Sequence, residues 1–361
     1  MKKHLSRRAV SAQLICVVIL GLLVASCGGG AQSETTQAQT DTTAGPTDTT
    51  SGPTDTTAGP TEIDTVRIGG SPLTNFAIFQ AAEEQGYLEE ARIELEVTNL
   101  AAGPLLMEAL IGGSIDVALP GHTDTLRAAT VYDDLRIIMG FTSLPDPPPE
   151  NNAFLVRADS GIESPEDLAG KRITTGILNN INHIYTEEWL ELHGVDPASV
   201  QFFEVPFPNM QDALDQGQVD GVFAVEPFAT VMLESGNYTN LGWPYNEINP
   251  GFTIVTGTVR QSWLDGNEGV AERLVCALSR GADYLENAED SERNRIVSEF
   301  TGIDAALVAR MHLPVYEIAL KEDTIQKTAD LLLKRGEIDQ PLDITSLLTE
   351  TATSEWATSN C

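Results

Sequence analysis

Small hydrogen-bonding residues gather where the strand-like stretches of this sequence end. The strand-end residues that could contact a ligand are Ser71, Leu73, Thr74, Gly121, His122, Thr123, Asp124, Phe141, Thr175, Gly176, Glu226 and Phe252. Ser and Thr hydroxyls and exposed backbone N–H groups supply hydrogen-bond donors without a permanent charge. The pattern therefore predicts non-covalent recognition of a small solute.

Arginine and lysine are absent from these strand ends, because Arg67, Arg136, Arg157 and Arg172 lie at strand starts or within strands. Sites for sulfonates or carboxylates commonly use the two-pronged guanidinium of Arg. A neutral or weakly basic ligand is therefore favoured, although backbone N–H groups at helix starts can also hold an anion. The sequence shows no Ser-His-Asp, His-x-x-x-His or paired-carboxylate arrangement, so we expect no catalytic residue, metal or cofactor.

Several of these residues have a second interpretation. His122 lies in a Gly-rich turn and faces either the ligand or the core, and for Phe141 and Phe252 core packing is the default. Asp116 and Asp220, which precede two predicted strands, are expected to cap turns rather than to touch a ligand.

The elements that must position these residues alternate between strands and helices from Thr65 onward. Strands are predicted at 66–70, 93–97, 115–119, 136–141, 153–157, 172–176, 201–205, 220–225 and 252–258. Helical stretches lie between most of them, and the later part of the chain reads as helices at 268–288, 291–299, 304–311, 322–335 and 343–350. This order is typical of an α/β fold with mostly parallel sheets.

Residues 1–26 are predicted to be a signal peptide, with a basic start and an apolar core of about twelve residues that is too short to span a membrane. The segment Val24-Ala25-Ser26-Cys27 resembles the lipobox of bacterial lipoproteins, which implies a lipidated Cys27 as the new N-terminus. An ordinary signal peptide with an incidental Cys is the alternative. Residues 27–64 repeat a Thr/Pro/Gly heptapeptide without an apolar face and are predicted to be a disordered tether. O-glycosylation of its threonines stays open.

The chain has 361 residues, with 21 Lys and Arg against 53 Asp and Glu, and a formal net charge of -32. Binding to nucleic acid or to an anionic membrane surface needs clustered cations and is excluded. Such a length allows one large or two ordinary domains. Cys276 and Cys361 remain once the leader is removed and Cys27 is lipidated, and in an oxidising compartment this pair suggests a disulfide. The alternative is a buried Cys276 with a free Cys361.

Two copies of one phrase carry a family resemblance: EALIGGSIDVAL at 108–119 and DALDQGQVDGVF at 212–223. With VRIGGSPLTNF, SPEDLAGKR and VEPF they resemble the nitrate, sulfonate, taurine and thiamine-precursor branch of ABC-transporter solute-binding proteins over residues 65–290. The resemblance implies a two-lobed periplasmic-binding-protein-like fold (type II), with a mostly parallel sheet in each lobe and the ligand in the cleft between lobes. It also implies ligand contacts at Glu226, the acid of VEPF, and at His183.

The resemblance places lobe one at 65–157 plus 249–361 and lobe two at 158–248, with the Pro-rich stretch 145–149 before the first crossing. It implies an extracytoplasmic component of an ABC importer that closes on a small solute and delivers it to permease and ATPase subunits, anchored to the cell membrane through Cys27. Two alternatives stay open: a ligand-sensing module, and a pyrimidine-synthesising enzyme of the same fold, whose Cys-rich motif is missing here.

Overall fold

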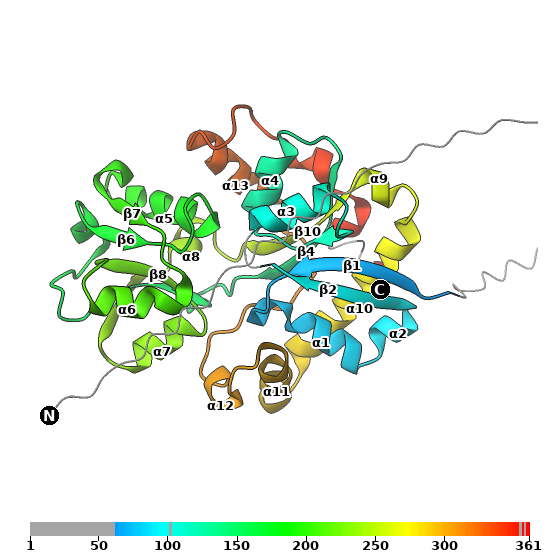
Figure 1. The fold of residues 1–361 in the computed structure, drawn as a ribbon, viewed down its shortest axis with the longest axis horizontal. Helices are drawn as coiled ribbons and strands as arrows, with labels where there is room; N and C mark the ends of the chain where they lie inside the picture. The colour runs from blue at the N-terminus through cyan, green and yellow to red at the C-terminus, as the bar shows by residue number, and fades with distance from the viewer. Residues whose placement is uncertain (1–61, 101–102, 354–355, 357–358) are drawn as a thin grey trace, which may run out of the picture. The chain divides into compact units, whose positions relative to one another are not determined.

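The computed structural model describes residues 62–361 except 101–102, 354–355 and 357–358. The predicted signal peptide, Cys27 and all but the last few residues of the predicted tether lie outside the described residues. The described chain forms two five-stranded sheets, in the orders β2-β1-β3-β10-β4 and β7-β6-β8-β5-β9, flanked by helices (Figure 1). The predicted α/β fold class is confirmed.

The first sheet has one antiparallel strand among parallel ones. Its strands are β1 (Asp64–Gly70), β2 (Ile93–Asn99), β3 (Val117–Ala118), β4 (Leu135–Ser143) and β10 (Thr253–Arg260). β10 runs antiparallel to both β3 and β4. One face packs against α1 (Ala77–Glu84), α2 (Tyr87–Glu90) and α10 (Glu268–Asn287), and α3 (Gly103–Ile111) and α4 (His122–Ala129) lie on the other (Figure 1). α9 (Gln261–Leu264) follows β10, and α11 (Asp290–Thr301) and α12 (Ala305–Val308) follow α10.

The second sheet repeats this arrangement. Its strands are β5 (Asn152–Arg157), β6 (Arg172–Thr174), β7 (Gln201–Phe203), β8 (Gly221–Val225) and β9 (Tyr238–Gly242), and its helices are α5 (Ile181–Leu192), α6 (Met210–Asp215), α7 (Phe228–Glu234) and α8 (Pro244–Ile248). Here β5 is the antiparallel strand, between β8 and β9. In each sheet, therefore, the antiparallel strand is the one that enters from the other sheet.

The first crossing differs from the predicted one. Residues 153–157 were assigned to lobe one, but β5 pairs with β8 and β9 and belongs to the second sheet. The connection is therefore 144–151, and the Pro-rich stretch is part of the crossing instead of preceding it. The apolar run of β5 fits a buried central strand of either sheet. The sheet to which β5 belongs is therefore shown only by its pairing with β8 and β9.

One ion pair occurs twice, once in each sheet. Nε of Arg67 donates to Asp116 Oδ2 at 2.9 Å, and Nε of Arg172 donates to Asp220 Oδ2 at 3.1 Å. Each Asp also accepts the backbone N–H of the same Arg, at 3.1 and 2.9 Å. Asp116 thus joins Arg67, within β1, to the chain leading into β3, and Asp220 joins Arg172, at the start of β6, to the chain leading into β8. They do not act as simple turn caps.

The C-terminal helix α13 (Glu322–Lys334) contacts elements of both sheets, although residues 249–361 were predicted to belong to lobe one. Lys334 and the adjoining Arg335 form ion pairs with Glu188 and Glu191 of α5. The predicted helix at 343–350 is instead two short 3-10 turns, Ile344–Leu347 and Glu350–Ala352.

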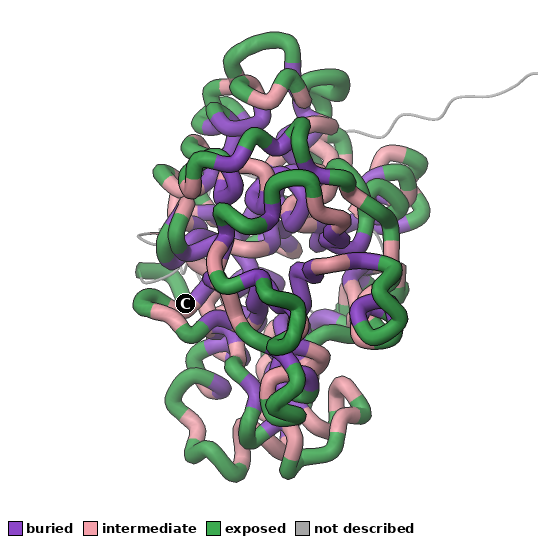
Figure 2. Tube along the Cα trace, turned by 90° about the vertical axis from the view of Figure 1, so that its left-hand side faces the viewer, coloured by how far each residue is buried: buried purple, intermediate pink, exposed green. Residues whose placement is uncertain are grey.

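Burial follows the strands and the inner helix faces, whereas exposed positions lie mostly on the outer turns (Figure 2). Within the described residues, no helix is long and apolar enough to cross a membrane. A disulfide joins Cys276 of α10 to Cys361, with their Cα atoms 4.9 Å apart and a sequence separation of 85.

Replacing Cys361 with Ser should lower the free energy of unfolding by about 4 kcal/mol, because the disulfide restricts the unfolded chain over a long loop. Urea-induced unfolding of the oxidised protein and of the variant measures the difference. The reduced wild-type protein is the matched control and should unfold with the variant. An unchanged midpoint in the variant would show that the bond does not stabilise the fold.

Candidate functional site

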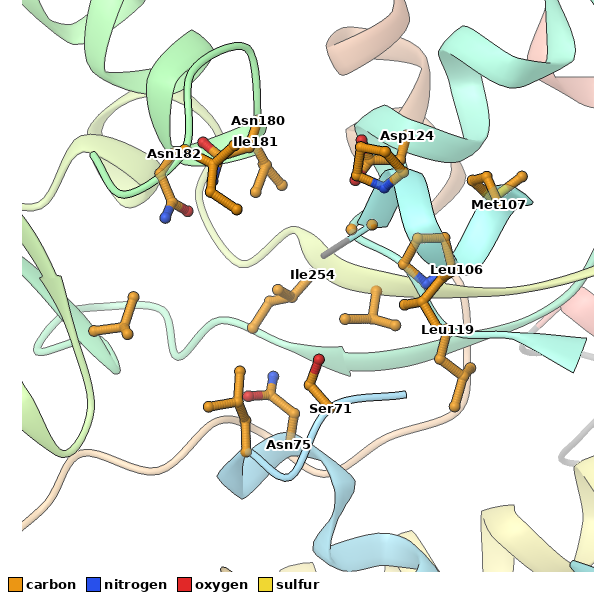
Figure 3. Close-up of a pocket in the computed structure, with 18 of the residues that line it drawn as sticks. Ser71, Asn75, Leu106, Met107, Leu119, Asp124, Asn180, Ile181, Asn182 and Ile254 are labelled. Carbon is orange, nitrogen blue, oxygen red and sulfur yellow. The ribbon is translucent and has the colours of Figure 1, made fainter. Parts of the chain in front are cut away.

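A cavity of about 680 Å³ opens at the carboxyl ends of strands from both sheets. The loops after β1 and β3 border it from the first sheet, and those after β6 and β8 border it from the second (Figure 3). In open α/β sheets ligands bind at this edge, where loops and helix starts expose backbone donors. The topology therefore brings two ligand-binding edges to one cavity.

One wall of the cavity is apolar and comes from α3. Leu106 and Met107 of α3 border the cavity, as do Leu119 and Ile254, and all four are labelled in Figure 3. α3 begins at Gly103, where a Cβ atom would lie only 1.9 Å from Oδ2 of Asp124, so any side chain there would displace the Asp124 carboxylate. Sequence analysis missed this wall because an apolar run in a helix also fits plain core packing.

Asparagine side chains provide much of the opposite, polar wall. Nδ2 of Asn75 donates to Thr142 Oγ1 at 2.8 Å, and Nδ2 of Asn182 donates to the Thr175 carbonyl oxygen at 3.1 Å. Asn180 caps α5, because its Oδ1 accepts the His183 N–H at 2.9 Å. Asn75, Asn180 and Asn182 surround the cavity in Figure 3. The cluster Asn179-Asn180-Ile181-Asn182 is the signal that could have identified this wall.

Six of the predicted contacts do border the cavity: Ser71, Leu73, Thr74, Gly121, Asp124 and Glu226. Burial raises the pKa of Asp124 to about 6, against the opposing effect of Arg127, whose guanidinium lies 3.8 Å away. Arg127 also borders the cavity and donates to Glu337 at 3.1 Å. A cationic side chain, that of Arg127, therefore borders the cavity. It does not lie at a strand end but in α4, which follows β3.

Glu226 borders the cavity with a carboxylate that is already fully engaged. Its side chain accepts hydrogen bonds from Thr230 N at 3.1 Å, Thr230 Oγ1 at 2.7 Å and His312 N at 3.0 Å. Thr230 belongs to α7 of the second sheet, whereas His312 follows α12, which belongs with the first. Glu226 therefore ties the two parts of the chain together beside the cavity.

His122 does not line the cavity, contrary to the prediction. Its ring is 0% exposed, with Nδ1 3.2 Å from the Ile254 carbonyl oxygen and Nε2 2.9 Å from Thr328 Oγ1. Burial lowers the pKa of His122 to about 4, so the ring is neutral at pH 7. The hydroxyl of Tyr185 reaches the same Thr328 oxygen at 2.6 Å. His122 thus belongs to a buried network that joins α4, α13 and α5.

The remaining predicted contacts also lie outside the cavity lining: Thr123, Phe141, Thr175, Gly176, His183 and Phe252. His183 Nδ1 accepts the Asn179 N–H at 2.9 Å, and burial with nearby Arg127 and Arg335 lowers its pKa to about 4. His183 therefore shapes the loop that borders the cavity without reaching it. Phe141 and Phe252 are core residues, and Gly176 adopts a φ of 98° in a turn.

The family model described as NMT1/THI5 like matches residues 73–291 of the 361 residues. The chain belongs to this family. The match begins within the loop after β1 and includes the loops after β3, β6 and β8 that border the cavity.

The individual relatives have low sequence identity to this chain but align with most of its length. YtlA of Bacillus subtilis (strain 168), named as a binding protein, is 22% identical over 297 residues, which cover 78% of this chain and 87% of the relative. A protein of Escherichia coli (strain K12) named for the binding of aliphatic sulfonates is 22% identical over 273 residues, covering 73% and 82%. The alkanesulfonate-binding protein SsuA from Xanthomonas axonopodis pv. citri, solved with MOPS, has a TM-score of 0.67 at 22% identity, covering 80% of this chain and 99% of that one. The NMT1/THI5-like chain therefore has the predicted periplasmic-binding-protein fold.

Replacing His122 with Ala should destabilise the protein by about 2–3 kcal/mol, because the change opens a buried space and leaves Thr328 without its partner. Thermal unfolding of the ligand-free protein measures the loss. His312→Ala is the matched control, since its side chain is exposed, and should change stability by less than about 0.5 kcal/mol. Equal stability of the two variants would contradict the buried network.

Proposed function

We propose that this protein is the solute-binding component of an ABC importer and works outside the cytoplasmic membrane. The observation that carries the proposal is the cavity bordered by loops of both sheets. A solute that contacts both edges favours the state in which the two sheets close around it. The relatives, which are named as binding proteins, support a role in capture, and a permease with its ATPase would receive the solute.

The solute that fits this cavity has an apolar body and a polar head. Leu106, Met107 and Ile254 offer the apolar surface, and the amides of Asn75, Asn152 and Asn182 offer hydrogen bonds. Aliphatic sulfonates, which the Escherichia coli relative is named for binding, combine these two features. We therefore place the ligand among small amphipathic organic solutes.

Filling the cavity should abolish binding. In wild type, an amphipathic solute at a hundred times its dissociation constant should add about 2.7 kcal/mol of stability in a thermal-shift screen. Ala128→Trp, which places an indole in the lining, should remove this response while the ligand-free protein still folds. Ala198→Trp, on an exposed turn, is the matched control and should respond like wild type. A full response in Ala128→Trp would place the site elsewhere.

Lipidation of Cys27 would hold the protein at the outer face of the membrane. Cys27→Ser removes the thiol that would be lipidated. Because stable anchoring needs two acyl chains, the exported variant should move from the membrane fraction to the soluble fraction. Fractionation of the source cells with immunodetection measures this. Cys16→Ser, the same change within the apolar core of the leader, should leave the protein in the membrane fraction. Membrane retention of Cys27→Ser would exclude this anchor.

A further inference from the structure

A buried carboxyl group stands directly behind one of the asparagines of the cavity. Asn152, at the start of β5, borders the cavity and is 2% exposed. Its Nδ2 donates to Oε2 of Glu150 at 2.7 Å and lies 3.4 Å from Asn151 Oδ1. Among the described residues its Oδ1 has no hydrogen-bond partner, which is costly for a buried amide. The missing partner must be a hydrogen-bond donor.

The charge of Glu150 is opposed by burial and by Glu247 and is favoured by its two hydrogen-bond donors, Asn152 and Asn246. Its side chain is 1% exposed, and Oε1 accepts the Asn246 N–H at 2.7 Å. Glu247 and Tyr245, which flank Asn246 on α8, add a negative charge and a buried hydroxyl to its surroundings. Burial raises the pKa of Glu150 to about 8, and the neighbouring charge of Glu247 adds to this effect. The neutral acid is therefore its main form at pH 7.

Protonation of Glu150 determines which atom Asn152 presents to the cavity. An ionised carboxylate only accepts hydrogen bonds, so it takes Nδ2 of Asn152 and leaves Oδ1 facing away from it. A protonated carboxyl donates through Oε2–H while Oε1 still accepts from Asn246. Asn152 then turns its amide by half a rotation, binds Glu150 through Oδ1 and presents its N–H groups.

We propose that Asn152, set by protonated Glu150, is the residue that selects the head group of the solute, and that it selects heads that accept hydrogen bonds, such as a sulfonate. This inference rests on the proposed function, because it names the recognition chemistry of the same cavity. It explains how an anionic head can be held although the cavity lining is rich in acids. A neutral Glu150 adds no further negative charge behind the head group.

Three acids of the cavity lining already have partners within the protein. The Glu226 carboxylate is engaged by Thr230 and His312, Asp124 lies beside Arg127, and Glu337 accepts from Arg127. One guanidinium nitrogen of Arg127, Nη2, has no hydrogen-bond partner within the described part of the chain, so Arg127 offers a second donor at the cavity border.

The test measures binding of hexanesulfonate and hexylamine to the full-length protein by calorimetry between pH 6 and pH 9.5. Hexanesulfonate keeps its charge over this range, so any pH dependence belongs to the protein. We expect hexanesulfonate to bind at least tenfold more tightly than hexylamine at pH 7. Its affinity should fall about tenfold per pH unit above pH 8, because deprotonation of Glu150 removes the donor that Asn152 presents.

The variant Glu150→Gln distinguishes the effect of Glu150 deprotonation on affinity from the effect of other groups that titrate in the same pH range. The Gln amide donates to Asn152 Oδ1 and accepts from Asn246 as the neutral acid does, so the variant should keep hexanesulfonate affinity within threefold at pH 6 and lose the decline at high pH. Glu163→Gln, the same change at an exposed site, should keep the decline. A decline that persists in Glu150→Gln, a pH-independent affinity in wild type, or tighter binding of hexylamine would overturn the proposal.

A second measurement needs no solute and therefore separates this inference from the proposed function. The side-chain amide resonances of Asn152, followed by NMR in the ligand-free protein, should shift with a midpoint near pH 8. In Glu150→Gln they should stay constant. A midpoint near 4.5, the ordinary value for Glu, would overturn the inference even if a solute binds in the cavity. Failure of both probes to bind, with the midpoint near pH 8, would instead contradict the proposed solute class.

Discussion

The direction of the parallel strands is the constraint on which the site depends. Parallel strands bring all their carboxyl ends to one edge of a sheet, so a sheet has one edge at which loops can gather around a ligand. The Arg67–Asp116 and Arg172–Asp220 pairs hold the opposite ends of equivalent strands in the two sheets. The cavity is formed where the two free edges meet, and it needs both sheets to be complete.

Predictions from the sequence were most accurate where local pattern and physical constraint coincide. The nine predicted strands are all present, because each is a short apolar run next to a turn. β9 was missed because Thr239 and Asn240 interrupt the apolar pattern of an edge strand. The repeated phrase correctly indicated two similar sheets. The role of its Asp could not be read locally, since its Arg partner lies almost fifty residues away.

Side-chain direction was the part that local sequence could not supply. His122 and Glu226 occupy matched positions after β3 and β8, yet only Glu226 borders the cavity. His122 turns toward Thr328 of α13. The sequence near His122 does not indicate this contact, because α13 lies about two hundred residues further along the chain. The asparagines that border the cavity were not predicted, because none taken singly has a distinctive local sequence. Each resembles an ordinary helix cap or turn residue until the fold brings together their three segments, around Asn75, Asn152 and Asn180.

The central claim is that one solute contacts the strand-end loops of both sheets. A crystal structure of the protein with a bound solute tests this most directly. We expect the solute to lie between the loop containing Ser71 and Asn75 and the loop containing Asn180 and Asn182, with its apolar body against Leu106 and Met107 of α3. A solute that touches the loops of one sheet only, or that binds outside this cavity, would contradict it.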